Sequence, residues 1–102
     1  MALYTDIGGK PVLYNFESAE ENIGNGINLL PLATPESITA GTYWIVLEVN
    51  NASTVCVDSA TSNTIVGGLE PFGTFPGNFN SVGSETTTTN TVDYNFFVYS
   101  ND

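Results

Sequence analysis

Positive charge is almost absent from this chain of 102 residues, which has one basic side chain, Lys10, and no histidine. Eleven Asp and Glu residues stand against it, so the formal net charge is −10 at pH 7. Proteins that bind nucleic acids or anionic membranes use Lys and Arg to neutralise phosphates. The composition therefore excludes both classes of function.

The lack of histidine also removes the usual base of a nucleophilic catalytic site. Lys10 lies in a Gly-Pro turn and is expected to be solvated. The alternative is a Lys–Asn isopeptide cross-link, which needs a buried lysine. P-loop, Rossmann and zinc signatures are absent, which leaves only carboxylate pairs for acid–base chemistry. Eleven acidic residues produce such pairs by chance, so we predict that the chain is not an enzyme. A hydrolase that uses only carboxylates is the weakest of the hypotheses considered for this chain.

Cysteine and long apolar runs are also scarce. Cys56 is the only cysteine, so no internal disulfide can form. The alternating pattern around it favours a small buried hydrophobic residue, and an intermolecular bridge or a reactive thiol is the alternative. No apolar run approaches the roughly 18–20 residues of a membrane helix. We interpret the start at Met1-Ala2 as the edge of a domain whose precursor was trimmed or whose signal was removed.

Strand signals dominate what is present. Val, Ile, Thr, Tyr and Phe cluster in short runs that Gly, Asn, Pro and Ser separate. No stretch shows sustained helical periodicity. We expect one domain over residues 1–102 with an all-β fold, an antiparallel, jelly-roll-like β-sandwich of about six to eight short strands. The clearest strands are predicted at 2–6, 12–18, 27–32, 42–49, 54–59 and 92–100, with turns at 7–11 and at Asn25-Gly26.

The strand at 42–49 carries two adjacent large aromatics, Tyr43 and Trp44. Neighbouring side chains of a strand point to opposite faces. The face of Tyr43 is uniformly large and apolar, so we expect it to form the core together with Ile45, Leu47 and Val49. Trp44 then shares the other face with Val46 and Glu48.

The segment 67–84 is unusual, because it has five Gly, two Pro and three Phe in eighteen residues. It is too rich in Gly and Pro for regular strands and too aromatic for a simple linker. Exposed aromatic rings bind sugars by stacking, and a continuous exposed apolar patch usually marks an interface. The predicted ligand-binding residues are Trp44, Phe72, Phe75 and Tyr99. The alternative is that this segment folds back and buries the rings.

Calcium is the ion that best suits the acidic composition, because it prefers carboxylate and carbonyl oxygens. The candidate ligands are Asp6, Asp58 and Glu70, which would join loops distant in sequence. The alternative is that these acids are dispersed and solvated.

Three stretches resemble β-sandwich accessory modules of secreted bacterial cell-surface proteins and extracellular enzymes. "LYTDIGGKP" resembles their first hairpin, "SITAGTYWIVLEV" a central strand, and "FPGNFNSVGSETTTTNTVDYNFFVYS" the Gly-rich loop and final strand. In those modules one or two strands precede the hairpin. This chain is therefore either a minimal version or one that lacks an N-terminal strand.

The resemblance implies an extracellular module beside catalytic, adhesive or anchoring domains, and it concerns fold more than activity. A surplus of Thr, Asn, Ser and Gly over Lys and Arg is also typical of extracellular proteins. We expect a non-catalytic binding or adhesion module for a glycan or cell-surface ligand. The alternative is a structural subunit that forms a homo-oligomer or filament by strand addition at an incomplete sheet edge.

Overall fold

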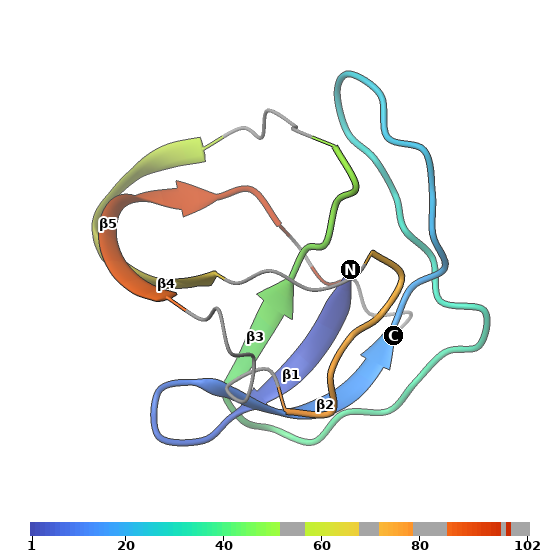
Figure 1. Cartoon of the computed structure of the whole chain (residues 1–102), viewed down its shortest axis with the longest axis horizontal. Coiled ribbons are helices and arrows are strands. Elements are labelled where there is room, and N and C mark those ends of the chain that lie inside the picture. The colour runs from blue at the N-terminus through green and yellow to red at the C-terminus, as the bar shows by residue number, and fades with distance from the viewer. Residues whose placement is uncertain (52–56, 68–71, 79–85, 97, 99–102) are drawn as a thin grey trace.

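Every regular element in the described part of the chain is a β-strand. The structure, a computed structural model, describes residues 1–51, 57–67, 72–78, 86–96 and 98 (Figure 1). Over these residues it contains no helix and has five strands: β1 (Ala2–Asp6), β2 (Pro11–Glu17), β3 (Tyr43–Val46), β4 (Val57–Gly67) and β5 (Thr86–Tyr94). The all-β class predicted from the sequence is confirmed for this part of the chain.

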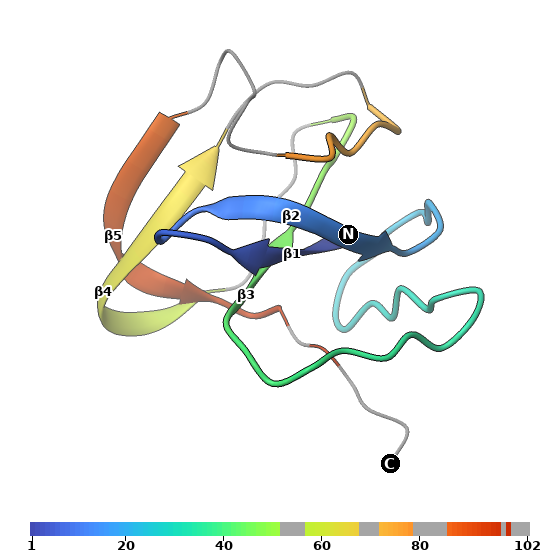
Figure 2. The same ribbon diagram turned by 90° about the horizontal axis from the view of Figure 1, so that it is seen from below.

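The strands form two antiparallel sheets. The first has three strands in the order β2-β1-β3, and the second is a ribbon of β4 and β5. Figures 1 and 2 both show the curved ribbon on one side of the three-stranded sheet and the irregular loop over residues 18–42 on the other side. β1 lies in the centre of the three-stranded sheet, so its side chains determine what that sheet buries.

The hairpin between β1 and β2 follows the sequence prediction closely. Gly8 and Gly9 have φ angles of 66° and 80°, which a residue with a Cβ adopts at a cost. The Ile7 amide donates to the Lys10 carbonyl at 3.0 Å and closes the turn. The Gly9 amide donates to Oδ2 of Asp6 at 3.2 Å. The two glycines and Asp6 thus set the turn that the pattern "DIGGKP" indicates.

β2 carries a bulge that the sequence pattern does not reveal. Leu3 pairs with Phe16 and Tyr4 pairs with Tyr14, so Asn15 has no opposite residue on β1. The side-chain nitrogen Nδ2 of Asn15 donates to the Leu3 carbonyl at 3.4 Å and to Oγ1 of Thr5 at 3.0 Å. The extra residue is therefore held by its own side chain. A bulge of this kind bends the strand and increases its twist.

The core of the three-stranded sheet lies on the face of Tyr4. Ala2 and Tyr4 are buried, and Tyr14, Trp44, Val46 and Phe75 pack against them. Tyr4 is the register partner of both Tyr14 on β2 and Trp44 on β3. The Tyr4 and Tyr14 rings meet edge to face, with centroids 5.7 Å apart, a preferred aromatic geometry.

The prediction that the Tyr43 face of β3 forms the core is therefore wrong, since Trp44 and Val46 face the core cluster. The other face is also covered, because Leu3, the partner of Ile45, is buried as well. Tyr43 is half-buried, and its hydroxyl donates to the Thr39 carbonyl at 2.6 Å. When both faces of a strand are partly buried, hydrophobic alternation does not identify the core face.

The predicted strand at 27–32 is absent, and this segment is part of the irregular loop over 18–42. Ile27 is 90% exposed and Leu29 is 70% exposed, so the apolar run "INLL" does not enter the core. Pro31, which lacks a backbone donor, is consistent with the missing strand pairing. The Asn25-Gly26 turn does form, with a φ angle of 85° at Gly26, but no hairpin follows it.

Three further strand limits differ from the predictions. β3 spans four residues and ends at Val46, whereas the pattern extends to 49. β4 extends to Gly67, well beyond the predicted end at 59, whereas the predicted start at 54 lies outside the described residues. β5 includes the threonine tract, as its β propensity indicates, and ends at Tyr94 instead of 100. The pairing of β4 with β5 is irregular between Ser59 and Asn63, so the ladder is interrupted at residues 60–62.

We predict that Gly9→Ala destabilises the fold by about 1 kcal/mol, because alanine must adopt the left-handed conformation. A Cβ at Gly9 would meet no atom within 4 Å, so only the backbone conformation opposes it. Gly24→Ala is the matched control, since Gly24 also has open space around it and its φ lies outside the left-handed region. Urea unfolding of both variants measures the difference. An equal loss of stability in the two variants would contradict the assignment.

Candidate functional site

The Gly-rich segment lies against the core face of the sheet in its described part. We call residues 72–78 the strap. The hydroxyl of Tyr4, which is fully buried, donates to the Pro76 carbonyl at 2.6 Å. The Tyr14 amide on edge strand β2 donates to the Gly77 carbonyl at 3.0 Å. Phe75 packs against the Ala2–Tyr4 cluster. These two hydrogen bonds and the Phe75 anchor fix residues 75–77 of the strap against the sheet.

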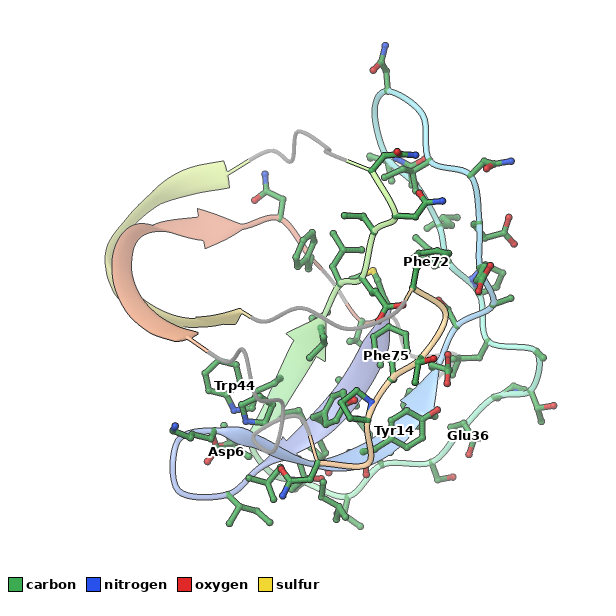
Figure 3. All side chains as sticks on the ribbon, viewed as in Figure 1. Asp6, Tyr14, Glu36, Trp44, Phe72 and Phe75 are labelled. Carbon is green, nitrogen blue, oxygen red and sulfur yellow. The ribbon has the colours of Figure 1, made fainter. Side chains whose placement is uncertain are left out.

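A cleft of about 290 Å³ opens beside the strap. Phe72 and Phe75 from the strap line it, together with residues that follow β2 and β3. Phe75 is half-buried, whereas Phe72 is 45% exposed. A second depression of about 270 Å³ shares Phe72 with it. Figure 3 shows Phe72 and Phe75 together on the strap, away from Trp44.

Gly73 is the residue at which the strap meets the acidic side of the cleft. Its amide donates to Oε1 of Glu48, which follows β3. Its φ angle is 89°, and a Cβ there would lie 2.9 Å from Oε1 of Glu20. The left-handed conformation favours glycine at this position, whereas the Glu20 carboxylate is the end of a flexible side chain that can move aside. Glu20 and Glu48, which are distant in sequence, are brought together around the strap backbone.

The lining of the cleft is rich in hydrogen-bond acceptors. Four carboxylates line it, from Glu17, Glu20, Glu21 and Glu48, and three amide groups, from Asn22, Asn50 and Asn51. A carboxylate accepts hydrogen bonds and does not donate them, whereas an amide group does both. The lining also includes Met1, whose ammonium group donates to Oγ of Ser18 at 3.1 Å. An exposed phenyl ring thus lies beside several hydrogen-bonding groups.

Trp44 occupies a different place. Its indole Nε1 donates to Oδ1 of Asp6 at 2.7 Å, and its ring packs against the Ala2–Tyr4 cluster. Figure 3 shows Trp44 and Asp6 side by side at the turn end of the sheet. Of the four aromatic residues predicted to bind a ligand, the structure brings Phe72 and Phe75 to one cleft and places Trp44 apart. Tyr99 lies outside the described residues.

The three predicted calcium ligands are not gathered in the described part of the chain. Both carboxylate oxygens of Asp6 accept hydrogen bonds, from Trp44 and from Gly9. Asp58 lies on β4, where the backbone register pairs it with Asp93 on β5, and Glu70 lies outside the described residues. Among the described residues, no three His, Cys, Asp or Glu side chains are grouped so that they could hold one metal ion. Calcium binding stays a prediction.

The sequence reasoning missed the carboxylates of the cleft. Glu20 lies in a polar stretch, and Glu48 lies within the predicted strand 42–49, on the face of Trp44. Because β3 ends at Val46, Glu48 lies in the loop that follows the strand, which the sequence pattern does not indicate. No local signal marks Glu20 either, because its proximity to Gly73 arises from the path of two loops.

Comparison with protein-family models, with curated proteins and with solved structures finds no match to this chain. In the part of the chain that the structure describes, no helix is long and apolar enough to cross a membrane. The residues of the cleft therefore carry the functional argument.

We predict that Tyr4→Phe lowers the free energy of unfolding by about 1 kcal/mol, because it leaves the Pro76 carbonyl of the strap without its donor. Tyr43→Phe is a matched control. It removes a hydroxyl that donates to the Thr39 carbonyl over the same distance, 2.6 Å, at an exposed site, where water replaces the lost donor. Urea unfolding compares the two. A loss at Tyr43→Phe as large as that at Tyr4→Phe would show that the strap contact is not stabilising.

Tyr14 supplies a pH-dependent prediction. Partial burial, then the hydrogen bond to Glu17 Oε1 at 2.9 Å and the charge of Glu17, raise the pKa of Tyr14 to about 12 from 10.0. Because the unfolded chain loses this proton first, the stability from Tyr14 is present below pH 10 and is lost as the pH rises to about 12. The difference in phenolate absorbance between wild type and Tyr14→Phe measures this pKa. A difference step near pH 10 would refute the assignment.

Proposed function

We propose that this chain is a non-catalytic extracellular binding module that recognises a glycan or another hydroxyl-rich cell-surface ligand at the cleft beside the strap. The observation that carries the proposal is Phe72, an aromatic ring 45% exposed at a cleft lined by carboxylates and amides. Ile23 and Val49, which are also exposed, line the same cleft, and a contiguous exposed apolar patch marks an interaction site, whereas a single exposed side chain does not.

The chemistry of the cleft suits a neutral carbohydrate. The apolar face of a sugar ring stacks on a phenyl ring, and its hydroxyl groups donate to carboxylates such as Glu20 and Glu21. The amide groups of Asn22 and Asn50 both donate and accept, so they suit hydroxyl groups in either role. Four carboxylates disfavour anionic ligands by charge repulsion. A neutral glycan therefore fits this cleft better than an acidic one.

The wider architecture is part of the same proposal. Two antiparallel sheets and no helix, in the described residues, support a jelly-roll-like sandwich of about six to eight strands. The sequence resemblance to accessory modules of secreted bacterial proteins supports an extracellular location. Under this proposal residues 1–102 form one domain, either a minimal version of such a module or one that lacks an N-terminal strand. Asp6, Asp58 and Glu70 remain the candidates for a calcium ion.

Self-association by strand addition is the second candidate function. β2 and β3 are the edges of the three-stranded sheet. The bulge at Asn15 and the backbone contact from Gly77 make β2 a poor template for another strand. β3 is thus the edge at which this proposal places a second copy. The net charge of −10 opposes such contacts, so added salt should favour them.

We predict that Phe72→Ala weakens glycan binding about fivefold to 150-fold, taking roughly 1–3 kcal/mol for the lost stacking, the value of a base stacked on an aromatic side chain. Leu13→Ala is the control, since Leu13 is similarly exposed at 54% but does not line the cleft. A glycan array identifies the ligand, and titration calorimetry measures the affinity of wild type and both variants. Light scattering at rising protein and salt concentration tests self-association in the same samples.

The outcomes separate the two functions. Binding that Phe72→Ala abolishes and Leu13→Ala preserves, in a monomeric protein, supports the binding module. An array without any hit, together with oligomers that grow with concentration, would replace it by the structural subunit. Binding that is insensitive to Phe72→Ala would move the site away from the cleft, with Trp44 as the next residue to substitute.

A further inference from the structure

The turn at Asn25-Gly26 stands in open solvent within the irregular loop over 18–42. Both residues are exposed. Gly26 has a φ angle of 85°, and a Cβ built there, or at Gly24, would meet no atom within 4 Å. The following residue has no side chain, so nothing hinders the approach of its backbone nitrogen to the Asn25 side chain. The local geometry thus leaves room for a ring to form between these two residues.

The side-chain amide of Asn25 and the backbone N–H of Gly26 are the two groups that such a ring would join. Among the hydrogen bonds of the described residues, none involves the Asn25 side-chain amide or the Gly26 backbone N–H. Asn28, three residues later, is also exposed, but its side chain is hydrogen-bonded. Its Oδ1 accepts from the Gly24 amide at 2.9 Å, and its Nδ2 donates to the carbonyls of Gly24 and Gly26 at 3.0 and 3.1 Å. Asn28 is therefore held in place, and Asn25 is not.

We propose that Asn25 is a site of spontaneous deamidation in the folded protein. The Gly26 backbone nitrogen, losing its proton to solvent, attacks Cγ of Asn25, and the Cγ–Nδ2 bond breaks as ammonia leaves. The product is a five-membered succinimide. Water then opens the ring at either carbonyl and gives aspartate or isoaspartate. The net change is one water consumed and one ammonia released, so no further reagent is needed.

The modification has two structural consequences. Each product adds a negative charge to a chain that already carries a net charge of −10. Isoaspartate also adds one carbon to the backbone between Gly24 and Gly26, whose carbonyls Asn28 holds. The hydrogen bonds from Asn28 to these two carbonyls cannot keep their geometry when the distance between Gly24 and Gly26 changes. Residues 19–23 of the same loop line the cleft, so the modification alters the loop beside the cleft without touching the sheet.

The test uses the full chain, incubated in mildly alkaline buffer and analysed over time by peptide mapping with mass spectrometry. Deamidation adds about 1 Da to the affected peptide, and methylation by an isoaspartyl methyltransferase reports the isoaspartate. The same incubation in denaturant gives the rate of the unfolded chain. Because the turn is exposed and unbonded, we expect the rate at Asn25 in the folded chain to lie within about tenfold of the unfolded rate.

Two controls make the outcome decisive. Asn25→Gln should abolish the conversion, since glutamine closes the larger ring much more slowly. Because Asn28 precedes Leu29, whose side chain itself slows ring closure, each site is compared with its own rate in denaturant. Conversion at Asn25 with isoaspartate detected, and a larger slowing on folding at Asn28 than at Asn25, support the proposal. A folded-state rate at Asn25 more than about tenfold below its unfolded rate, or an equal slowing at the two sites, overturns it. The experiment needs no ligand, so its result is independent of the proposed glycan binding.

Discussion

The burial of Tyr4 is the constraint on which the described structure depends. Its ring lies on the central strand, between Tyr14 on one neighbour and Trp44 on the other. Its hydroxyl, inside the core, needs a partner because an unpaired buried hydroxyl is costly. The Pro76 carbonyl supplies that partner. One side chain thus joins the three-stranded sheet to the strap, and the strap in turn presents Phe72.

Much of the first hairpin could be predicted from the sequence, because its determinants are local. Alternation in "VLYNFE" and the pair Gly8-Gly9 each indicate their structure without help from distant residues. The strand predicted at 27–32 failed for the opposite reason. Its apolar pattern is genuine, but a strand exists only when a partner pairs with it. Whether a pairing strand is available depends on the rest of the chain, so the sequence of residues 27–32 cannot indicate it.

The candidate site, too, was predictable where its features are local in sequence and not where they depend on distant residues. Phe72 and Phe75 were identifiable, because three aromatics in a Gly-rich segment are conspicuous in sequence. Their different roles were not, since only the tertiary contacts make Phe75 an anchor and leave Phe72 exposed. The grouping of Glu20 with Glu48 around Gly73 depends on residues that are far apart in the chain. Local pattern thus predicts which residues are unusual, and the topology decides which of them meet.

The contact between Trp44 and Asp6 gives the protein an optical reporter. Trp44 is the only tryptophan, and its indole nitrogen is bonded to the carboxylate that also holds the first turn. Tryptophan fluorescence, excited selectively over that of the five tyrosines, therefore originates at the turn end of the three-stranded sheet and away from the cleft. Its emission will follow the opening of the sheet, whereas a ligand that stacks on Phe72 will leave it nearly unchanged. Folding and binding can thus be observed by separate signals in one unlabelled molecule.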